Sequence, residues 1–128
     1  MTTPPIHGLL LFAHGARDPR WALPFEDVAR RVRAQAPDLR VELAFLEFMA
    51  PNLGDCARTL VEEGYDAISV VPMFIAQGGH LKNDVPVLMD ELRNAHPDVR
   101  FVLSPPVGET ETIVQAMASY ALGLAQGF

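Results

Sequence analysis

The sequence predicts an α/β fold: a single three-layer domain in which a four-stranded parallel sheet carries helices on both faces. Short apolar segments alternate along the chain with segments whose apolar residues recur at helical spacing, an order typical of a parallel sheet. The segment 9–11 and residues Ile68, Val70 and Val71 would be apolar on both faces of a strand, as in a sheet covered on two sides.

Four strand–helix pairs follow one another along the chain. The strands are expected near residues 6–13, 40–47, 67–74 and 99–104. The helices are expected near 25–36, 52–63, 84–95 and 110–125, each with one apolar and one polar face. Pro24 precedes the first helix and Pro37 follows it, which marks both of its ends. We predict the strand order 2-1-3-4.

Composition narrows the class of protein. A chain of 128 residues that is 49% hydrophobic can fill one core, so we expect one domain over 1–128. A net charge of −6 without a run of cations argues against nucleic acid as a partner. The apolar runs are too short to span a membrane, and no secretion signal is recognised. The single cysteine, Cys56, is expected in the core of a cytoplasmic protein.

Right-handed crossovers would place every strand-to-helix loop at the same edge of this sheet. Two histidines stand where apolar runs give way to glycines: His14 before Gly15, and His80 after Gly78 and Gly79. In open α/β sheets, ligands bind at this edge. The sequence therefore predicts that both imidazoles lie at one rim of the sheet. Imidazoles placed together in this way are typical of a transition-metal or proton-transfer site.

Each of these side chains could instead have a structural role. A histidine that ends a buried strand can be structural, although Gly15 would also allow the backbone to approach a ligand closely. The glycines before His80 could simply make a tight turn. Glu47, at the end of the second strand, could be a ligand or proton acceptor, or it could pair with Arg17 or cap a helix.

Other residues at the rim are weaker candidates. Met73 and Phe74 could form the floor of a site for a flat ligand, but apolar residues at strand ends are more often core. The sequence contains no phosphate-binding glycine motif, no G-x-S-x-G, no C-x-x-C and no H-E-x-x-H. The usual nucleotide-binding, hydrolase, thioredoxin-like and zincin classes therefore lack their defining residues.

Three segments together resemble the short CbiX-type class II chelatases, which insert a divalent metal into sirohydrochlorin without ATP. They are 10–19 with its HG-x-RDP motif, 45–51 with Glu47 and Pro51, and 71–86 with its GGH-x-x-x-D-x-P motif. The resemblance covers nearly the whole chain. It implies a chelatase-like fold, of which this single domain would be one flavodoxin-like half.

The resemblance also implies roles for the residues. His14 and His80 would bind the metal and accept protons, with Glu47 as the supporting acid. Arg17, Arg20 and Lys82 would meet the carboxylates of the substrate, with Gly78, Gly79, Met73 and Phe74 beside it. Co²⁺ is preferred as the metal substrate, with Fe²⁺ or Ni²⁺ as alternatives, and no tightly bound cofactor is expected.

Long members of the family contain two such domains, so this chain is expected to pair with itself as a homodimer. An apolar face left uncovered on the last helix, or beside the first, would favour that pairing. Two other functions stay open. A metal or tetrapyrrole carrier could use the same histidines as plain ligands. Phosphoryl transfer through a phosphohistidine is disfavoured, since Ala13 stands where an arginine is expected.

Overall fold

The structure is a computed structural model that describes residues 7–127. Its strands are β1 (His7–Ala13), β2 (Arg40–Phe45), β3 (Ala67–Pro72) and β4 (Arg100–Leu103). They alternate with the helices α1 (Leu23–Gln35), α2 (Leu53–Glu62), α3 (Gly79–Ala95) and α4 (Glu111–Gln126). Two 3-10 turns, η1 (Pro19–Ala22) and η2 (Val107–Glu109), precede α1 and α4. The predicted alternation of strands and helices is confirmed, but its first residue, 6, lies outside the described residues.

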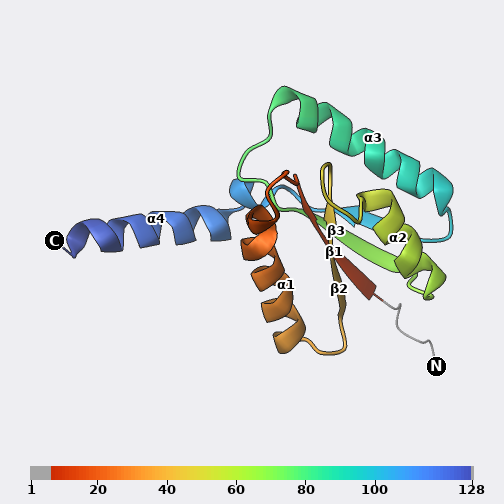
Figure 1. Cartoon of the computed structure of the whole chain (residues 1–128), viewed down its shortest axis with the longest axis horizontal. Coiled ribbons are helices and arrows are strands. Elements are labelled where there is room, and N and C mark those ends of the chain that lie inside the picture. The colour runs from red at the N-terminus through yellow and green to blue at the C-terminus, as the bar shows by residue number, and fades with distance from the viewer. Residues whose placement is uncertain (1–6, 128) are drawn as a thin grey trace.

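The four strands form one parallel sheet in the order β2-β1-β3-β4, as predicted (Figure 1). The first strand lies in the middle, and its Leu10 is in register with Glu42 on one side and Val70 on the other. Because all strands run in the same direction, the loops that leave them meet at one edge of the sheet.

Alternate residues of the strands face two different layers of helices. Helices α2 and α3 cover one face, where side chains such as Leu10, Phe12 and Met89 are fully buried. Helix α1 covers part of the other face, packing Ala29 against Leu11 and Val41. Cys56 is buried on the α2 side, which confirms its expected place in the core. Within residues 7–127, no helix is both long and apolar enough to cross a membrane.

Several boundaries differ from the sequence prediction. Strand β3 ends at Pro72 and not at residue 74, and α1 begins at Leu23, so that Pro24 lies inside the helix and not before it. Strand β2 ends at Phe45, so Glu47 lies in the bend that follows the strand and not on the strand. Helix α3 begins at Gly79, five residues earlier than expected, and it continues through Pro86. In its first turn only Leu81 is half-buried, so this turn lacks the apolar stripe by which helices are recognised in sequence.

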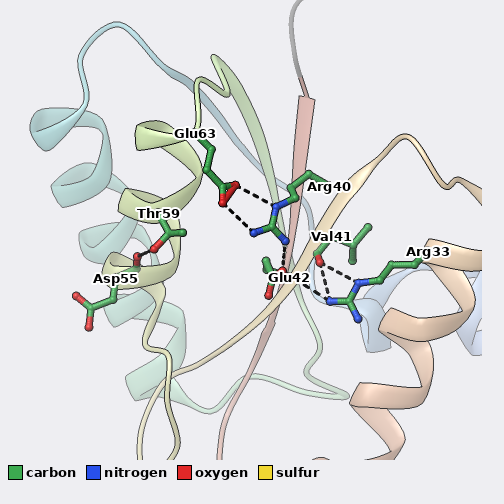
Figure 2. A network of polar contacts seen from close by, with 7 residues as sticks. All are labelled: Arg33, Arg40, Val41, Glu42, Asp55, Thr59 and Glu63. Carbon is green, nitrogen blue, oxygen red and sulfur yellow. Dashed lines mark hydrogen bonds and ion pairs between the residues drawn. The ribbon is translucent and has the colours of Figure 1, made fainter.

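At the opposite end from the strand-to-helix loops, an ion-pair network fixes the edge strand β2 (Figure 2). Arg40 donates to both carboxylate oxygens of Glu63 at 3.1 and 3.2 Å, and it also pairs with Glu42. Arg33, from α1, donates to the carbonyl oxygen of Val41 at 2.7 and 3.1 Å. These contacts tie α2 and α1 to the edge strand, and Arg33 occupies a backbone acceptor on it.

The last helix departs from the layered arrangement. Figure 1 shows α4 projecting away from the sheet and from the other three helices. Its amino end is joined to η2, where Val114 donates its amide hydrogen to the carbonyl oxygen of Thr110. None of its residues is buried.

Candidate active site at the carboxyl edge of the sheet

The side chains of His14 and Glu47 form a hydrogen-bonded pair at the edge where the strands end. His14 follows β1 and Glu47 follows β2, its neighbour in the sheet, and Nε2 lies 3.0 Å from Oε1. When the carboxylate is ionised and the imidazole is neutral, Nε2 donates its hydrogen to Glu47, which leaves the lone pair on Nδ1. The two side chains are 44% and 49% exposed, so a ligand can reach them from solvent.

The backbone holds the two loops together beneath this pair. The amide of Leu46 donates to the carbonyl of Ala13 at 2.9 Å, and the amide of Glu47 donates to the carbonyl of His14 at 3.1 Å. Gly15 has a φ of +92°, and a Cβ there would lie 1.9 Å from the carbonyl oxygen of Glu47. The close approach that this glycine allows is therefore to the neighbouring loop.

A third contact joins the same two loops. The guanidinium carbon of Arg17 lies 4.6 Å above the ring centroid of Phe48, in cation–π geometry. Phe48 is 56% exposed and has a φ of +67°, a backbone conformation that is uncommon outside glycine. Glu47 could have paired with Arg17, but the structure pairs it with His14. The sequence pattern gave no indication that Phe48 would be the partner of Arg17.

Arg20, another cation expected at the rim, already has a carboxylate partner. It donates from its guanidinium to both oxygens of Asp18, and Asp18 also caps η1 by accepting from the amide of Arg20. The hydrogen bonds from the Arg20 side chain and backbone hold the pKa of Asp18 below its usual range. Within residues 7–127, Arg17 has no such ion pair, so its charge is the more available of the two.

The aromatic ring of Phe74 supports the imidazole of His14 from the core. The two ring centroids are 6.4 Å apart in an edge-on arrangement, and Phe74 packs in the same way on Phe12 at 5.7 Å. Phe74 is only 5% exposed, and Met73 packs half-buried in the apolar clusters on the α1 side. The alternative that these two residues belong mainly to the core therefore fits their burial.

The side chain of His80 makes no hydrogen bond or ion pair with His14 or Glu47. His80 is the second residue of α3 and is exposed, and its side chain makes no hydrogen bond or ion pair among the described residues. Gly78, Gly79 and Lys82 are exposed beside it, and a Cβ on either glycine would meet nothing within 4 Å. The structure thus places His80 in the first turn of α3 and not in a loop before it.

The loops after β3 and β4 are joined as tightly as those after β1 and β2. The amide of Gly108, in η2, donates to the carbonyl of Phe74 at 3.0 Å. A Cβ on Gly108 would lie 1.7 Å from the carbonyl oxygen of Ile75. Sequence reasoning missed Gly108, although its position after a pair of prolines at a strand end was a signal for a tight turn.

Two further features complete the description of this part of the molecule. Residues 7–127 contain no group of three or more His, Cys, Asp or Glu side chains placed to hold a metal ion. A cleft of about 520 Å³ lies between α2 and α3, with Asn52, Arg58, Leu88 and His96 among its lining residues. Neither His14, Glu47 nor His80 lines this cleft.

The fold and the site define a class of protein. It is an open parallel α/β domain that presents a histidine–carboxylate pair at the strand ends, where such sheets bind ligands. The CbiX family profile matches residues 8–121. The chain therefore belongs to the CbiX family.

Known relatives resemble the chain over most of its length. A sirohydrochlorin cobaltochelatase of Sulfurisphaera tokodaii is 31% identical over 115 residues, which is 88% of each chain. A putative cobalamin biosynthesis CbiX protein from Marinobacter aquaeolei superposes with a TM-score of 0.81 at 28% identity, covering 95% of this chain and 99% of that one. The sirohydrochlorin chelatase SirB of Bacillus subtilis, solved with cobalt, has a TM-score of 0.77 at 24% identity. There the match covers 93% of this chain but 51% of SirB.

Proposed function

We propose that this protein inserts a divalent metal ion into sirohydrochlorin, with the edge that carries His14 and Glu47 as its active site. The observation that carries the proposal is the exposed, hydrogen-bonded His14–Glu47 pair at the strand ends of a chain that belongs to the CbiX family. The metal ion and the tetrapyrrole are both substrates. No ATP and no tightly bound cofactor is required by this chemistry.

Metal insertion exchanges one cation for two protons. The incoming M²⁺ forms bonds to the ring nitrogens, and the two pyrrole N–H bonds break with release of both protons. Since Nε2 of His14 is bonded to Glu47, Nδ1 is the atom that can bind the metal transiently or accept a pyrrole proton. Glu47 orients the ring and stabilises it when it becomes an imidazolium.

We assign His80 as the second group that binds metal and accepts protons. Its imidazole is exposed in the first turn of α3, which follows the loop that leaves β3 at the same edge of the sheet as the His14 loop. The open space around Gly78 and Gly79 leaves room for a ligand to approach the backbone there. In this proposal the tetrapyrrole lies between the two imidazoles, and His80 acts on the metal and not through Glu47.

The cations at the rim would recognise the carboxylates around the tetrapyrrole. Arg17 is exposed yet held in place on Phe48, so its guanidinium can pair with a carboxylate at reduced entropic cost. Lys82 is exposed two residues after His80 and would supply a second cation. Met73 and Phe74 would lie below the tetrapyrrole, where Phe74 also supports the His14 ring through their edge-on contact.

Cobalt is the preferred metal substrate, because the CbiX family relatives include a protein named as a cobaltochelatase. Imidazole and carboxylate also suit Fe²⁺ and Ni²⁺. Insertion of iron would place the protein in siroheme synthesis, and insertion of nickel would lead to a nickel tetrapyrrole. We further propose that the chain acts in the cytoplasm, as one chelatase domain over 1–128, and that two copies pair as a homodimer around the macrocycle.

The test is the anaerobic absorbance of sirohydrochlorin mixed with Co²⁺, Fe²⁺ or Ni²⁺, with and without protein. We expect the wild type to accelerate insertion of at least one metal, and His14→Ala and His80→Ala each to lose most of that acceleration. His7→Ala is a matched control, since His7 bonds Ser69 at the other end of β1. Equal rates with and without protein, together with a spectral change on binding, would instead identify a carrier.

A further inference from the structure

The first two turns of helix α3 carry a histidine and an aspartate one turn apart. His80 and Asp84 are four residues apart in the GGH-x-x-x-D-x-P motif, and α3 includes both of them. Residues at this spacing lie one above the other on the same side of an α-helix, about 6 Å apart along its axis. Both residues are exposed, so one solute can reach both side chains.

This side of α3 is turned toward α2, its neighbour on the same face of the sheet (Figure 1). Glu91 lies three turns after His80, so it projects from the same side of the helix, and it lines the cleft between α2 and α3. Helix α2 packs on β2 and β1, whereas α3 packs on β4. The side that carries His80 and Asp84 therefore faces the strands whose loops hold His14 and Glu47.

Asp84 has no structural task that would account for it. Its carboxylate makes no hydrogen bond or ion pair with another residue of 7–127, whereas Asp90 on the same helix lies 3.6 Å from Arg93. Asp84 is the sixth residue of α3, beyond the first turn in which an acidic side chain can satisfy the free amide groups. The first turn contains no acidic residue, and the N-cap Gly78 provides no side-chain hydrogen bond. The stability of the helix therefore does not explain Asp84.

The local charge explains why His80 needs a carboxylate beside it to bind a cation. The amino end of a helix carries about half a positive charge, because its first amide groups have no partners. Lys82 adds a positive charge two residues after His80, although it projects from the other side of the helix. A dication at a neutral imidazole alone would be repelled by these charges. The carboxylate of Asp84 offsets them on the side where the imidazole lies.

We propose that His80 and Asp84 together form the site that receives the metal substrate before it enters the tetrapyrrole. One imidazole nitrogen and one carboxylate oxygen bind the M²⁺, and water completes its coordination. Residues 7–127 contain no group of three His, Cys, Asp or Glu side chains placed to hold a metal ion, so the site has two protein ligands. Imidazole and carboxylate suit the divalent metals considered above. The inference rests on the proposed function, in which His80 already binds the metal.

The two histidines have different tasks in this arrangement. At α3, the bonds from the metal to the imidazole and the carboxylate break as its bonds to the ring nitrogens form. Nδ1 of His14 accepts one of the two protons that leave the pyrrole nitrogens, and the imidazole of His80, freed when the metal leaves, accepts the other. Structural metal sites use four protein ligands, whereas two leave the ion free to exchange, as a substrate must.

Calorimetric titration with Co²⁺ in the absence of tetrapyrrole tests this site. The full chain carries His14→Ala, so that the other imidazole proposed to bind metal is absent. Removing a ligand should cost at least as much as removing the partner of a ligand, so we expect Asp84→Asn to weaken Co²⁺ binding about tenfold or more. Asp84→Glu keeps the carboxylate and should restore most of the affinity. Asp90→Asn is the matched control, since it removes the same charge about 15 Å along the helix from His80 and should have no effect.

A double-mutant cycle distinguishes a shared ion from attraction at a distance. If both side chains bind one ion, Asp84→Asn should have almost no further effect once His80→Ala has removed the site. If the carboxylate acted only as a distant charge, Asp84→Asn would weaken Co²⁺ binding equally with and without His80. Its effect would also vanish at about 1 M salt, where the Debye length is about 3 Å. Either of these two results would overturn the proposal.

Insertion kinetics in the otherwise wild-type chain separate this site from the chelatase function. We expect Asp84→Asn to raise the KM for Co²⁺ about tenfold or more without raising the KM for sirohydrochlorin. An unchanged KM for Co²⁺ in a variant that still inserts metal would overturn the receiving site and leave the chelatase function standing. Coupled binding of Co²⁺ by His80 and Asp84 in a protein that accelerates insertion of no metal would support the site and overturn the chelatase function.

Discussion

The backbone of Gly15 lies against the backbone of Glu47 so closely that a methyl group on Gly15 would come within 1.9 Å of the Glu47 carbonyl oxygen. This contact places the loop after β1 directly on the loop after β2. The imidazole and the carboxylate then meet above it at 3.0 Å. The geometry of the proposed active site therefore depends on a residue that carries no functional group.

Gly15→Ala should separate the two loops and reduce metal insertion by at least tenfold, because the carbonyl it meets is backbone and cannot rotate away. Gly64→Ala is the matched control. Gly64 also has a positive φ, +98°, but a Cβ there meets nothing within 4 Å. The control should cost about 1–2 kcal/mol of unfolding free energy from backbone strain alone. Denaturant unfolding should show a larger loss for Gly15→Ala, and equal losses would exclude a steric role for the contact.

Glu47→Gln keeps an oxygen that can accept from Nε2 of His14 but removes the negative charge. Substituting the partner of a metal-binding histidine typically costs about 10–100-fold in metal affinity or activity, and we expect a fall of that size in insertion rate. Glu26→Gln, on the exposed side of α1, changes the net charge equally and should have no effect. Initial rates at saturating sirohydrochlorin measure both. An unchanged rate for Glu47→Gln would limit Glu47 to a structural role.

The sequence predicted the strand order, and the edge of the sheet at which His14 lies, because both follow from hydrophobic periodicity and the handedness of crossovers. Leu10 and Val70 are buried on the same face, as their positions in the apolar runs require. His14 was placed correctly since it directly follows such a run.

What the sequence could not reveal depends on contacts between loops. Phe48 has no periodic signal, and its position over Arg17 arises from a backbone conformation that the pattern does not encode. The start of α3 was misplaced because the turn containing His80 has no apolar face. The projection of α4 was equally hidden, since its apolar residues recur at helical spacing whether the helix packs on the sheet or points away from it.

The ion pair between Arg40 and Glu63 predicts a contribution to stability that is lost in acid. The hydrogen bonds from Arg40 hold the pKa of Glu63 below its ordinary value of 4.5. The unfolded chain therefore takes up this proton at a higher pH than the folded chain does. The contribution is complete above the unfolded pKa and disappears as pH falls through the folded pKa.

Glu63→Gln should therefore make unfolding free energy depend less steeply on pH below 4.5, with a smaller effect near pH 7 because the pair is exposed. Urea titrations between pH 3 and 7 measure this slope. Glu62→Gln, one residue away, exposed and outside the ion pairs, should leave the slope as in the wild type. A Glu63→Gln slope equal to that of the wild type would show that the pair does not persist in solution.

The thiol of Cys56 should make the unfolding free energy fall as pH rises in the alkaline range, whereas the Glu63 pair makes it rise with pH in acid. Burial raises the pKa of its thiol from 9.0 to about 11, because the thiolate would lose its hydration among apolar side chains of α2. Between these values the unfolded chain loses the proton while the folded chain retains it, so unfolding free energy falls as pH rises from 9 to about 11.

The thiol of Cys56 should react slowly with a disulfide reagent at pH 8 in the folded protein and rapidly after denaturation. Cys56→Ala should lower stability at every pH through lost packing, yet remove this part of the alkaline slope. Fast reaction in the native protein at pH 8 would show that α2 opens far more readily than its buried contacts imply.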